Sequence, residues 1–491
     1  MRKLTQAFLL SLCISGPSPA LSQIGNAATT PDGISLPSMG TDTSPHRSAA
    51  EAKLRGEWLM RQIRRGLNLF YDPEIDNYIV DLGYRLVSNS DYHNRFFYFF
   101  GVNDPSINAF AAPGGYIGVH SGLILAAETE GELAAVMAHE VAHIGQLHID
   151  RATEEANKLS LPTYAALVAA VILGSQNANI TEAAILATMA ANIQSNLNFT
   201  RAHEREADHI GMKILTQSQF DPHAMPAFFE RLQQNDRLYD AQVPEFFRTH
   251  PVTSNRIAET RDRASKYDYH PLPDKLRFHL IKAKIRVLSS DNPADMVARY
   301  EAKLNTGSYT HRYAELYGYS LALLKNHQFE EAGKVIESLI KEDRERIPYL
   351  LVKAQIKSSS GQVKESYSVF EDALALYPNN YALSHSYAET LLQFGEPEKA
   401  ASLLNSMKKN HPTPPLYQLL AKAEGESRHT AKAHQALAEF YFLNGLTHTA
   451  IEQLNLALKQ RRVSDMDKIR IESRMQEFKE IALAEKNLDL N

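Results

Sequence analysis

Hydrophobic residues recur at helical spacing along most of the chain. After about residue 48, Leu54, Trp58 and the turns after them follow this pattern. The basic residues between them are Lys53, Arg55, Arg61, Arg64 and Arg65. We therefore predict a helix with one apolar and one basic face. We expect the basic face to be solvated, and the alternative is peripheral contact with a membrane surface.

Two short stretches have the composition of strands instead. Phe96–Val102 and Tyr116–Val119 are rich in aromatic and β-branched residues. Pro113, Gly114 and Gly115 come just before the second stretch, and such a cluster is typical of a turn. The pattern predicts a small β-sheet within a helical region.

The helical pattern returns at Glu132 and continues to about residue 266. Two apolar stretches lie within it, Leu161–Gly174 and Ile180–Ile193, each of about 14 residues. Roughly 20 apolar residues are needed to cross a bilayer, so neither stretch is long enough. We expect a buried helical hairpin. The alternative is a hairpin near the active site that touches lipid or substrate.

The C-terminal half of the chain repeats. His327, Gly361 and Gly395 are 34 residues apart, and Pro378 and Pro412 each close one unit. Small or apolar residues recur at three further positions of the unit: Ser320, Ala354 and Ala388; Ala332, Ser366 and Ala400; Ile336, Phe370 and Leu404. This period, with small residues where two helices would cross, resembles the tetratricopeptide repeat.

The register of the repeat breaks after Pro412. It resumes with Ala438, Gly445 and Ala450, shifted by 16 residues, which is about one extra helix. At least four helix pairs between about residues 275 and 480 would stack into a solenoid with a concave binding surface. The alternative is a generic helical bundle.

The N-terminus has the composition of a secretory signal peptide. Arg2 and Lys3 precede an apolar stretch from Ala7 to Ile14 and then small residues, so cleavage is expected after Ser22. A short membrane anchor is the alternative. Residues 23–48 are rich in Pro, Gly, Ser, Thr and Asp, which indicates a flexible leader.

The residues absent from the mature chain exclude several kinds of chemistry. Cys13 is the only cysteine, and it lies in the signal peptide. Disulfides, thiolate metal sites and a cysteine nucleophile are therefore excluded. No G-x-S-x-G motif supports serine hydrolysis. The net charge of −5 and the lack of a nucleic-acid motif predict no nucleic-acid partner.

One uninterrupted helical pattern, Glu132–His143, contains the motif H-E-x-x-H as His139, Glu140 and His143. Histidines at i and i+4 lie one turn apart on one helix face, so both imidazoles can reach one tetrahedral metal ion. Glu140 then faces the open side of the ion, where it can accept a proton from water and pass it to the leaving amine. The pattern predicts a zinc metalloprotease, and histidines without a metal are the alternative.

A catalytic zinc needs a third protein ligand. The metzincin continuation is absent, because Gly145, Gln146 and His148 do not give a third histidine at the required spacing. A later helical segment offers Glu204 and Asp208 at i and i+4. Glu204 can bind the metal while Asp208 accepts a hydrogen bond from a ligand imidazole. His203 and His209 are competing ligands, and Glu206 is expected to point away and be solvated.

His250 is a further candidate, in the sequence Thr249-His250-Pro251 with Arg256 after it. A protease of this kind needs a donor or positive group for the oxyanion of the tetrahedral intermediate. His250 could supply it, or could occupy the fourth position on zinc and hold the enzyme inactive. The third interpretation is an ordinary loop histidine.

The H-E-x-x-H motif is followed about 60 residues later by the motif E-x-x-x-D, at Glu204 and Asp208. This arrangement resembles that of the HtpX-like and CAAX-prenyl-type zinc metalloproteases. The stretches Asn108–Ile117 and Ser121–Leu123 add to this resemblance. It implies that Glu204 is the third ligand of one zinc ion per chain. Tyr116, Ile117, Gly118 and Val119 then become a candidate substrate-binding strand, because an exposed strand edge beside the zinc helix can pair with an extended peptide. An ordinary core strand is the alternative.

The signal peptide, the segment Leu36–Gly40 and the repeats narrow the resemblance to periplasmic members from Gram-negative bacteria. The resemblance implies that the protein degrades misfolded or misassembled outer-membrane proteins and also assists the assembly of such proteins. It also implies that the β-barrel assembly machinery is a partner. No stabilising disulfide can be carried over, because the mature chain lacks cysteine.

We thus expect a predominantly α-helical protein. A zincin-like metalloprotease domain with a small β-sheet (49–268) would follow the signal peptide (1–22) and leader (23–48). An α-solenoid of tetratricopeptide repeats (269–491) would recruit the clients. The alternative function is a chaperone or adaptor that acts through the solenoid, with a silent or structural metal site.

Overall fold

The structure is a computed structural model that describes residues 49–148, 201–238, 246, 249–268, 275–461 and 463–487. The expected signal peptide, the leader and the apolar pair 161–193 lie outside these residues. The described helices and strands are α1 (Ala49–Gly66), α2 (Pro73–Ser88), β1 (Tyr98–Val102), β2 (Ala109–Ala112), β3 (Tyr116–His120), α3 (Ser121–Ala126), α4 (Glu130–Gly145), α8 (Arg201–Gln217), α9 (Ala224–Leu238), α11 (Ser254–Ala264), α12 (Leu276–Leu288), α13 (Pro293–Thr306), α14 (Arg312–Lys325), α15 (Phe329–Glu342), α16 (Ile347–Ser359), α17 (Val363–Leu376), α18 (Tyr381–Gln393), α19 (Pro397–Met407), α20 (Pro414–Glu426), α21 (Thr430–Leu443), α22 (Thr447–Leu458) and α23 (Asp465–Asn487).

The small sheet has three strands in the order β1-β3-β2. β1 runs parallel to β3, and β2 runs antiparallel to it. Strands β1 and β3 are expected from the sequence pattern, but β2 is not, because its residues Ala109–Ala112 include no β-branched side chain. The turn before β3 requires Gly115, because its φ is +90° and a Cβ there would lie 2.0 Å from the carbonyl oxygen of Phe96.

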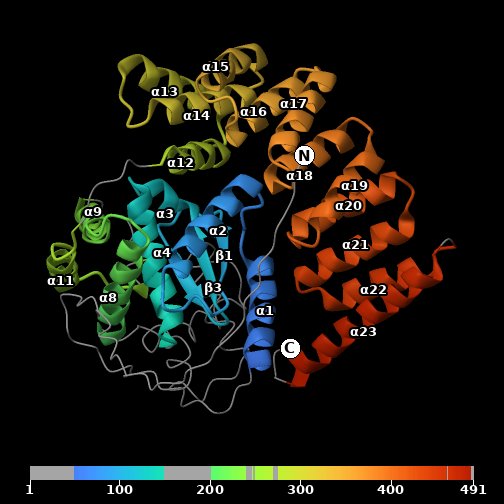
Figure 1. Cartoon of the computed structure of the whole chain (residues 1–491), viewed down its shortest axis with the longest axis horizontal. Coiled ribbons are helices and arrows are strands. Elements are labelled where there is room, and N and C mark those ends of the chain that lie inside the picture. Colours follow the sequence, from blue (N-terminus) through green and yellow to red (C-terminus); the bar gives the residue numbers. More distant parts are fainter. Residues whose placement is uncertain are drawn as a thin grey trace, which may run out of the picture. The chain divides into compact units, whose positions relative to one another are not determined.

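Helices cover both faces of the sheet (Figure 1). Trp58 and Ile63 of α1 pack with Phe100 and Phe110 on one face. On the other face, side chains of α2 and α4 form the main core with residues of the strands such as Ile117. The expected basic face of α1 is therefore not wholly solvated. Arg61 is 4% exposed and forms an ion pair with Glu485 of α23, because the repeat region packs against this helix.

Helix α4 lies among α2, α8, α9 and the sheet (Figure 1). Every residue from Glu130 to His143 is buried, so the helix is apolar on nearly all sides. Thr129 caps its N-terminus by accepting a hydrogen bond from the amide of Glu132 at 3.2 Å. Helix α8 approaches closely through Gly211, where a Cβ would lie 3.1 Å from the backbone of His139. This contact brings the two motif-bearing helices together.

The C-terminal half consists of successive helices from α12 to α23, and the predominantly helical fold class with a small sheet is confirmed. The small residues of the repeat lie at helix crossings. Ser320 Oγ donates to the carbonyl of Ala332 at 3.1 Å, and Ser366 Oγ donates to that of Ala354 at 2.8 Å. The positions 34 residues apart share a left-handed turn, with φ of +60° at His327 and +82° and +80° at Gly361 and Gly395.

The break in register after Pro412 has a structural cause. Helices α20, α21 and α22 follow α19, and turns with positive φ lie at Arg428 (+61°) and Gly445 (+75°). Helix α21 packs equally closely against α20 and α22, whereas α15 and α17 pack mainly against the helix before them, so α20, α21 and α22 form a group of three helices. In the part of the chain that the structure describes, no helix combines the length and the apolar character that a membrane span requires.

Candidate active site

Four buried side chains from three segments meet beside α4. His139 and His143 come from α4, Glu204 from α8, and His250 from the segment before α11. Their ligand atoms all lie within 4.8 Å of one another. The Nε2 atoms of the two α4 histidines are 3.0 Å apart, and each is 3.4 Å from one oxygen of Glu204. His250 Nδ1 lies 2.9 Å from Glu204 Oε1 and 3.4 Å from His139 Nε2.

These distances and charges suit a metal ion. Donor atoms about 2.0–2.1 Å from a tetrahedral zinc ion are separated by about 3.3 Å. The observed separations of 2.9 to 3.4 Å surround such a point. When ionised, Glu140, Glu204 and Asp208 carry three negative charges and Arg256 carries one positive charge, so one divalent cation balances the buried cluster.

Glu140 lies next to the four-residue group and is 0% exposed. Among the described residues no hydrogen bond of ordinary geometry reaches its two oxygens, and His250 Nε2 is 3.5 Å from Oε1. Burial raises the pKa of Glu140, although the charges of His250 and His139 and the backbone amide of Ala111 act in the opposite direction. A buried carboxylate of raised pKa is suited to exchange protons with a reacting molecule.

Asp208 and Arg256 support the cluster through their contacts with His139 and Glu204. His139 Nδ1 is 3.1 Å from Asp208 Oδ1. Arg256 of α11 donates to both oxygens of Asp208, at 2.7 and 2.8 Å, and its Nη1 lies 2.8 Å from Glu204 Oε2. Burial alone would raise the pKa of Asp208, but the hydrogen bonds from Arg256 and His139 outweigh it and lower the pKa. Arg256, which the sequence marked only as a nearby cation, thus fixes both α8 carboxylates.

His148 is a site residue that the sequence pattern does not predict. It is fully buried, its Nδ1 lies 2.9 Å from Nδ1 of His143, and its Nε2 lies 3.1 Å from Glu206 Oε2. The expectation that Glu206 is simply solvated is wrong, because this contact draws its side chain towards the site, where it is 20% exposed. Burial and the neighbouring His143 lower the pKa of His148 to about 3.

The competing histidines lie outside the group of four. His203 stacks on His148 with ring centroids 4.4 Å apart, and neither His203 nor His209 belongs to the described group of potential metal ligands. Each lies one residue from one of the carboxylates Glu204 and Asp208 and five residues from the other, so each points to a different side of α8. The left-handed turn at Leu147, which has no glycine to mark it, is what places His148 here.

The expected substrate strand needs a correction. Tyr116–Val119 belongs to β3, which is the central strand, with β1 paired on one side and β2 on the other. Its backbone groups are therefore used within the sheet. The outer strand that packs against α4 is β2. The sequence pattern placed the edge on the wrong strand because β2 was not recognised.

The fold and this site define an H-E-x-x-H metalloprotease with a helical repeat region. The family model described as peptidase family M48 matches residues 73–264, and a tetratricopeptide-repeat model matches residues 359–423. The beta-barrel assembly-enhancing protease of Escherichia coli K12 is 30% identical over 447 residues, which cover 91% of each chain. The protein of the same name from Yersinia pestis is 28% identical over 474 residues, covering 96% of this chain and 97% of that one.

A relative from Vibrio cholerae is 34% identical over 476 residues, 96% of each chain. The mitochondrial metalloendopeptidase OMA1 of Schizosaccharomyces pombe is 30% identical over 161 residues, covering only 33% of this chain and 44% of that one. The chain therefore belongs to peptidase family M48, among the beta-barrel assembly-enhancing proteases that carry C-terminal tetratricopeptide repeats.

Proposed function

We propose that the protein is a zinc-dependent endopeptidase of the periplasm that degrades misfolded or misassembled outer-membrane proteins and assists their assembly. The observation that carries the proposal is the buried group of His139, His143 and Glu204 with Glu140 beside it. The three ligands would hold one zinc ion, which would act as a Lewis acid on the scissile carbonyl. A periplasmic location rests on the signal-peptide pattern of residues 1–22.

The side chains around the metal would have separate roles in the reaction. Glu140 would accept a proton from the attacking water and deliver it to the leaving amine, and its raised pKa makes it a stronger base for the first of these transfers. Asp208 would keep the proton of His139 on Nδ1, so that Nε2 presents its lone pair to the metal. Arg256 would keep Glu204 and Asp208 ionised and in place.

An extended substrate would pair with the outer edge of β2. β2 is an outer strand of the sheet and packs against α4, so it lies beside the helix that carries Glu140. Main-chain pairing tolerates many side-chain sequences, which suits a protease for unfolded polypeptide. Peptides N-methylated at single amides should bind the Glu140→Gln variant less tightly at alternate positions only. Equal binding of all the methylated peptides would contradict the strand model.

His250 would occupy the fourth position around the metal and hold the site closed until its segment moves. Its Nδ1 is 3.4 Å from His139 Nε2 and 2.9 Å from Glu204, which is the spacing of a further ligand. This arrangement favours gating over oxyanion stabilisation among the two catalytic roles expected from the sequence.

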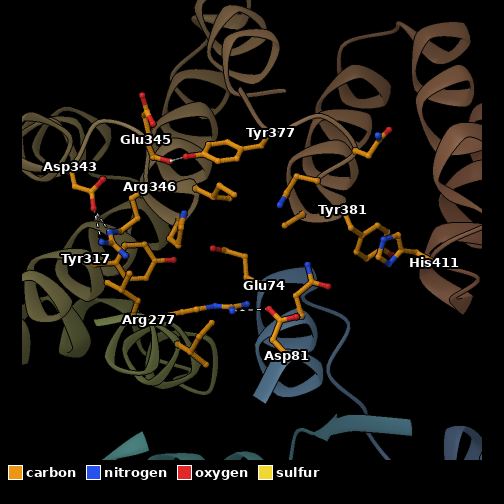
Figure 2. A pocket seen from close by; sticks show the side chains of 18 residues that line it. Glu74, Asp81, Arg277, Tyr317, Asp343, Glu345, Arg346, Tyr377, Tyr381 and His411 are labelled. Atoms are coloured by element: carbon orange, nitrogen blue, oxygen red, sulfur yellow. Dashed lines mark hydrogen bonds and ion pairs between the residues drawn. The ribbon is translucent and has the colours of Figure 1, made fainter. Parts of the chain in front are cut away.

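The repeat region, which we place from residue 269 onwards, would recruit the clients. A pocket of about 730 Å³ lies where α2 meets α12, α14, α16 and α18, and Figure 2 shows the side chains that face it. Glu74, Asp81, Glu345 and several tyrosines line it, and such mixed polar and aromatic surfaces suit an unfolded chain segment. The names of the relatives point to outer-membrane β-barrel assembly as the source of clients.

This pocket also favours the second candidate function, a chaperone or adaptor that acts through the repeats. Glu140→Gln separates the two functions. Cleavage of casein by the purified mature chain should fall about 10²- to 10⁴-fold, while zinc stays near one per chain. Glu128→Gln, the same change at a carboxylate 71% exposed outside α4, is the control and should leave cleavage unchanged. Wild-type protein that neither binds zinc nor cleaves would leave only the chaperone function.

A further inference from the structure

Several contacts at the C-terminus of α4 hold His148 against His143, the second histidine of the H-E-x-x-H motif. The helix ends at Gly145, where a Cβ would lie 2.2 Å from the ring of Tyr92, and Gln146 Nε2 donates to the hydroxyl of Tyr92 at 2.8 Å. Leu147 then adopts a left-handed conformation with φ of +55°. A residue other than glycine adopts this conformation at a cost, which the surrounding contacts must offset. The result is that His148 lies against His143.

The contacts of the two imidazoles indicate which of them donates the hydrogen bond between them. His143 directs Nε2 towards His139 and Glu204, 3.0 and 3.4 Å away, so a metal would be bound through this atom. Its proton then resides on Nδ1, which donates to Nδ1 of His148 over 2.9 Å. His148 must accept through Nδ1, so its own proton is on Nε2. That proton is donated to Glu206 Oε2 over 3.1 Å.

We propose that His148 and Glu206 form a hydrogen-bond relay that fixes the tautomer and orientation of His143 as a metal ligand. The inference rests on the proposed zinc function. Both residues are positioning residues, since neither contacts the metal position directly. His139 receives the same support in one step from Asp208, and His143 receives it in two steps. Helix α8 supplies the terminal carboxylate in both cases and the ligand Glu204 as well.

The chemistry of the relay distinguishes it from ordinary packing. Two nitrogen atoms buried 2.9 Å apart repel each other unless one carries a proton and the other a lone pair. The carboxylate at the far end selects the direction, because Glu206 accepts and does not donate when ionised. A ligand imidazole held in this way is more basic and less free to rotate, and loss of such support costs about 10- to 100-fold in metal affinity.

The test compares zinc affinity in three variants, by competition with a chelator, on the inactive Glu140→Gln background. His148→Phe keeps the ring and its stacking on His203 but has no acceptor, so we expect zinc to bind about 10- to 100-fold more weakly. His148→Asn restores an acceptor oxygen near the position of Nδ1, and should recover part of that loss. Glu206→Ala removes only the end of the relay and should give an intermediate loss.

A spectroscopic readout separates orientation from general destabilisation. With Co²⁺ in place of zinc, His148→Phe should shift the visible absorption bands, because the geometry of a ligand imidazole has changed. The control is His203→Phe, which keeps an aromatic ring stacked on His148 and should leave zinc affinity and the Co²⁺ spectrum unchanged. If His148→Phe does not fold, Glu206→Ala decides the question, because its side chain is 20% exposed and its removal leaves the core intact.

Two results would overturn the relay. One is unchanged zinc affinity and an unchanged Co²⁺ spectrum in the variants. The other is an equal loss in His148→Phe and His148→Asn with no effect of Glu206→Ala, which would assign His148 to packing. Both results presuppose that the wild-type protein binds zinc. A wild-type protein that binds none would instead contradict the proposed function, so the two failures are distinguishable.

Discussion

The side chain of His250 lies both among the potential metal ligands and next to Glu140. Its Nδ1 lies among the potential metal ligands and its Nε2 is 3.5 Å from Glu140. A substrate carbonyl and the attacking water need the same space. If the histidine closes the site, the enzyme works only in the fraction of molecules where it has moved away.

We therefore predict that His250→Ala increases the initial rate of casein cleavage on the order of 10-fold, because the competent state no longer has to displace a ligand. The measurement is the initial rate at fixed zinc occupancy, with His223→Ala, an exposed histidine on a different loop, as the control. A fall of about 10²-fold or more would contradict gating and assign His250 to the oxyanion.

At the scale of single residues, the sequence identifies those site residues whose spacing alone places them on one face of a helix. His139 with His143, and Glu204 with Asp208, are pairs at i and i+4, so the helix period alone brings each pair onto one face. Helix periodicity cannot show where His148 lies, because Leu147 adopts a left-handed conformation that no glycine marks in the sequence, and His148 then contacts His143. Glu206 was misjudged for the same reason, since its partner comes from that turn.

Between elements, the contact of α8 with α4 sets the geometry of the site. Gly211 lies seven residues after Glu204 and three after Asp208, so it shares their helix face. A Cβ at Gly211 would lie 3.1 Å from both the Cα and the amide nitrogen of His139. Backbone atoms cannot rotate away as side-chain ends can, so the helices would have to separate.

We predict that Gly211→Ala destabilises the protein by about 1–3 kcal/mol, although the same change in an open helix position stabilises by about 1 kcal/mol. Urea unfolding and zinc affinity measure the effect, and both should fall. Gly333→Ala in α15 is the matched control, because the nearest atom to its Cβ is 4.0 Å away. A gain in stability at both positions would show that the α4–α8 contact is not tight.

The elements that the sequence predicted best are those with a long repeat. Ser320, Ala354 and Ala388 recur every 34 residues and all lie buried in the structure. Strand β2 was missed because four residues, Ala109–Ala112, give too short a pattern to be distinguished from a loop. Its position follows from pairing with β3, which is a tertiary contact that a local pattern does not contain.

Across the whole chain, buried ion pairs join the repeat helices to the helices around the sheet. Lys284 of α12 pairs with Asp72 and Glu74 at the start of α2. Arg61 of α1 pairs with Glu485 of α23, with each side chain 5% exposed. Removing one partner of such a pair leaves the other charge buried and alone, which costs far more than the loss of a surface pair.

We predict that Glu485→Gln lowers the free energy of unfolding by about 3–5 kcal/mol, measured by urea denaturation of the mature chain. Glu330→Gln is the control, because its pair with Lys334 is 77% and 69% exposed and should contribute no more than about 1 kcal/mol. Equal stability of the two variants would mean that the Arg61–Glu485 contact does not hold α23 in solution.

The burial of α4 on all sides has a consequence for how such an enzyme can evolve. The helix that carries the reacting groups is also the centre of the main core. Its side chains are therefore under selection for activity and for stability at the same time. A substitution that would speed the reaction from within α4 also risks unfolding the domain. Variation in rate and specificity is therefore most accessible in loop segments beside the helix, such as the residues next to His250, whose side chains can change while α4 remains unchanged.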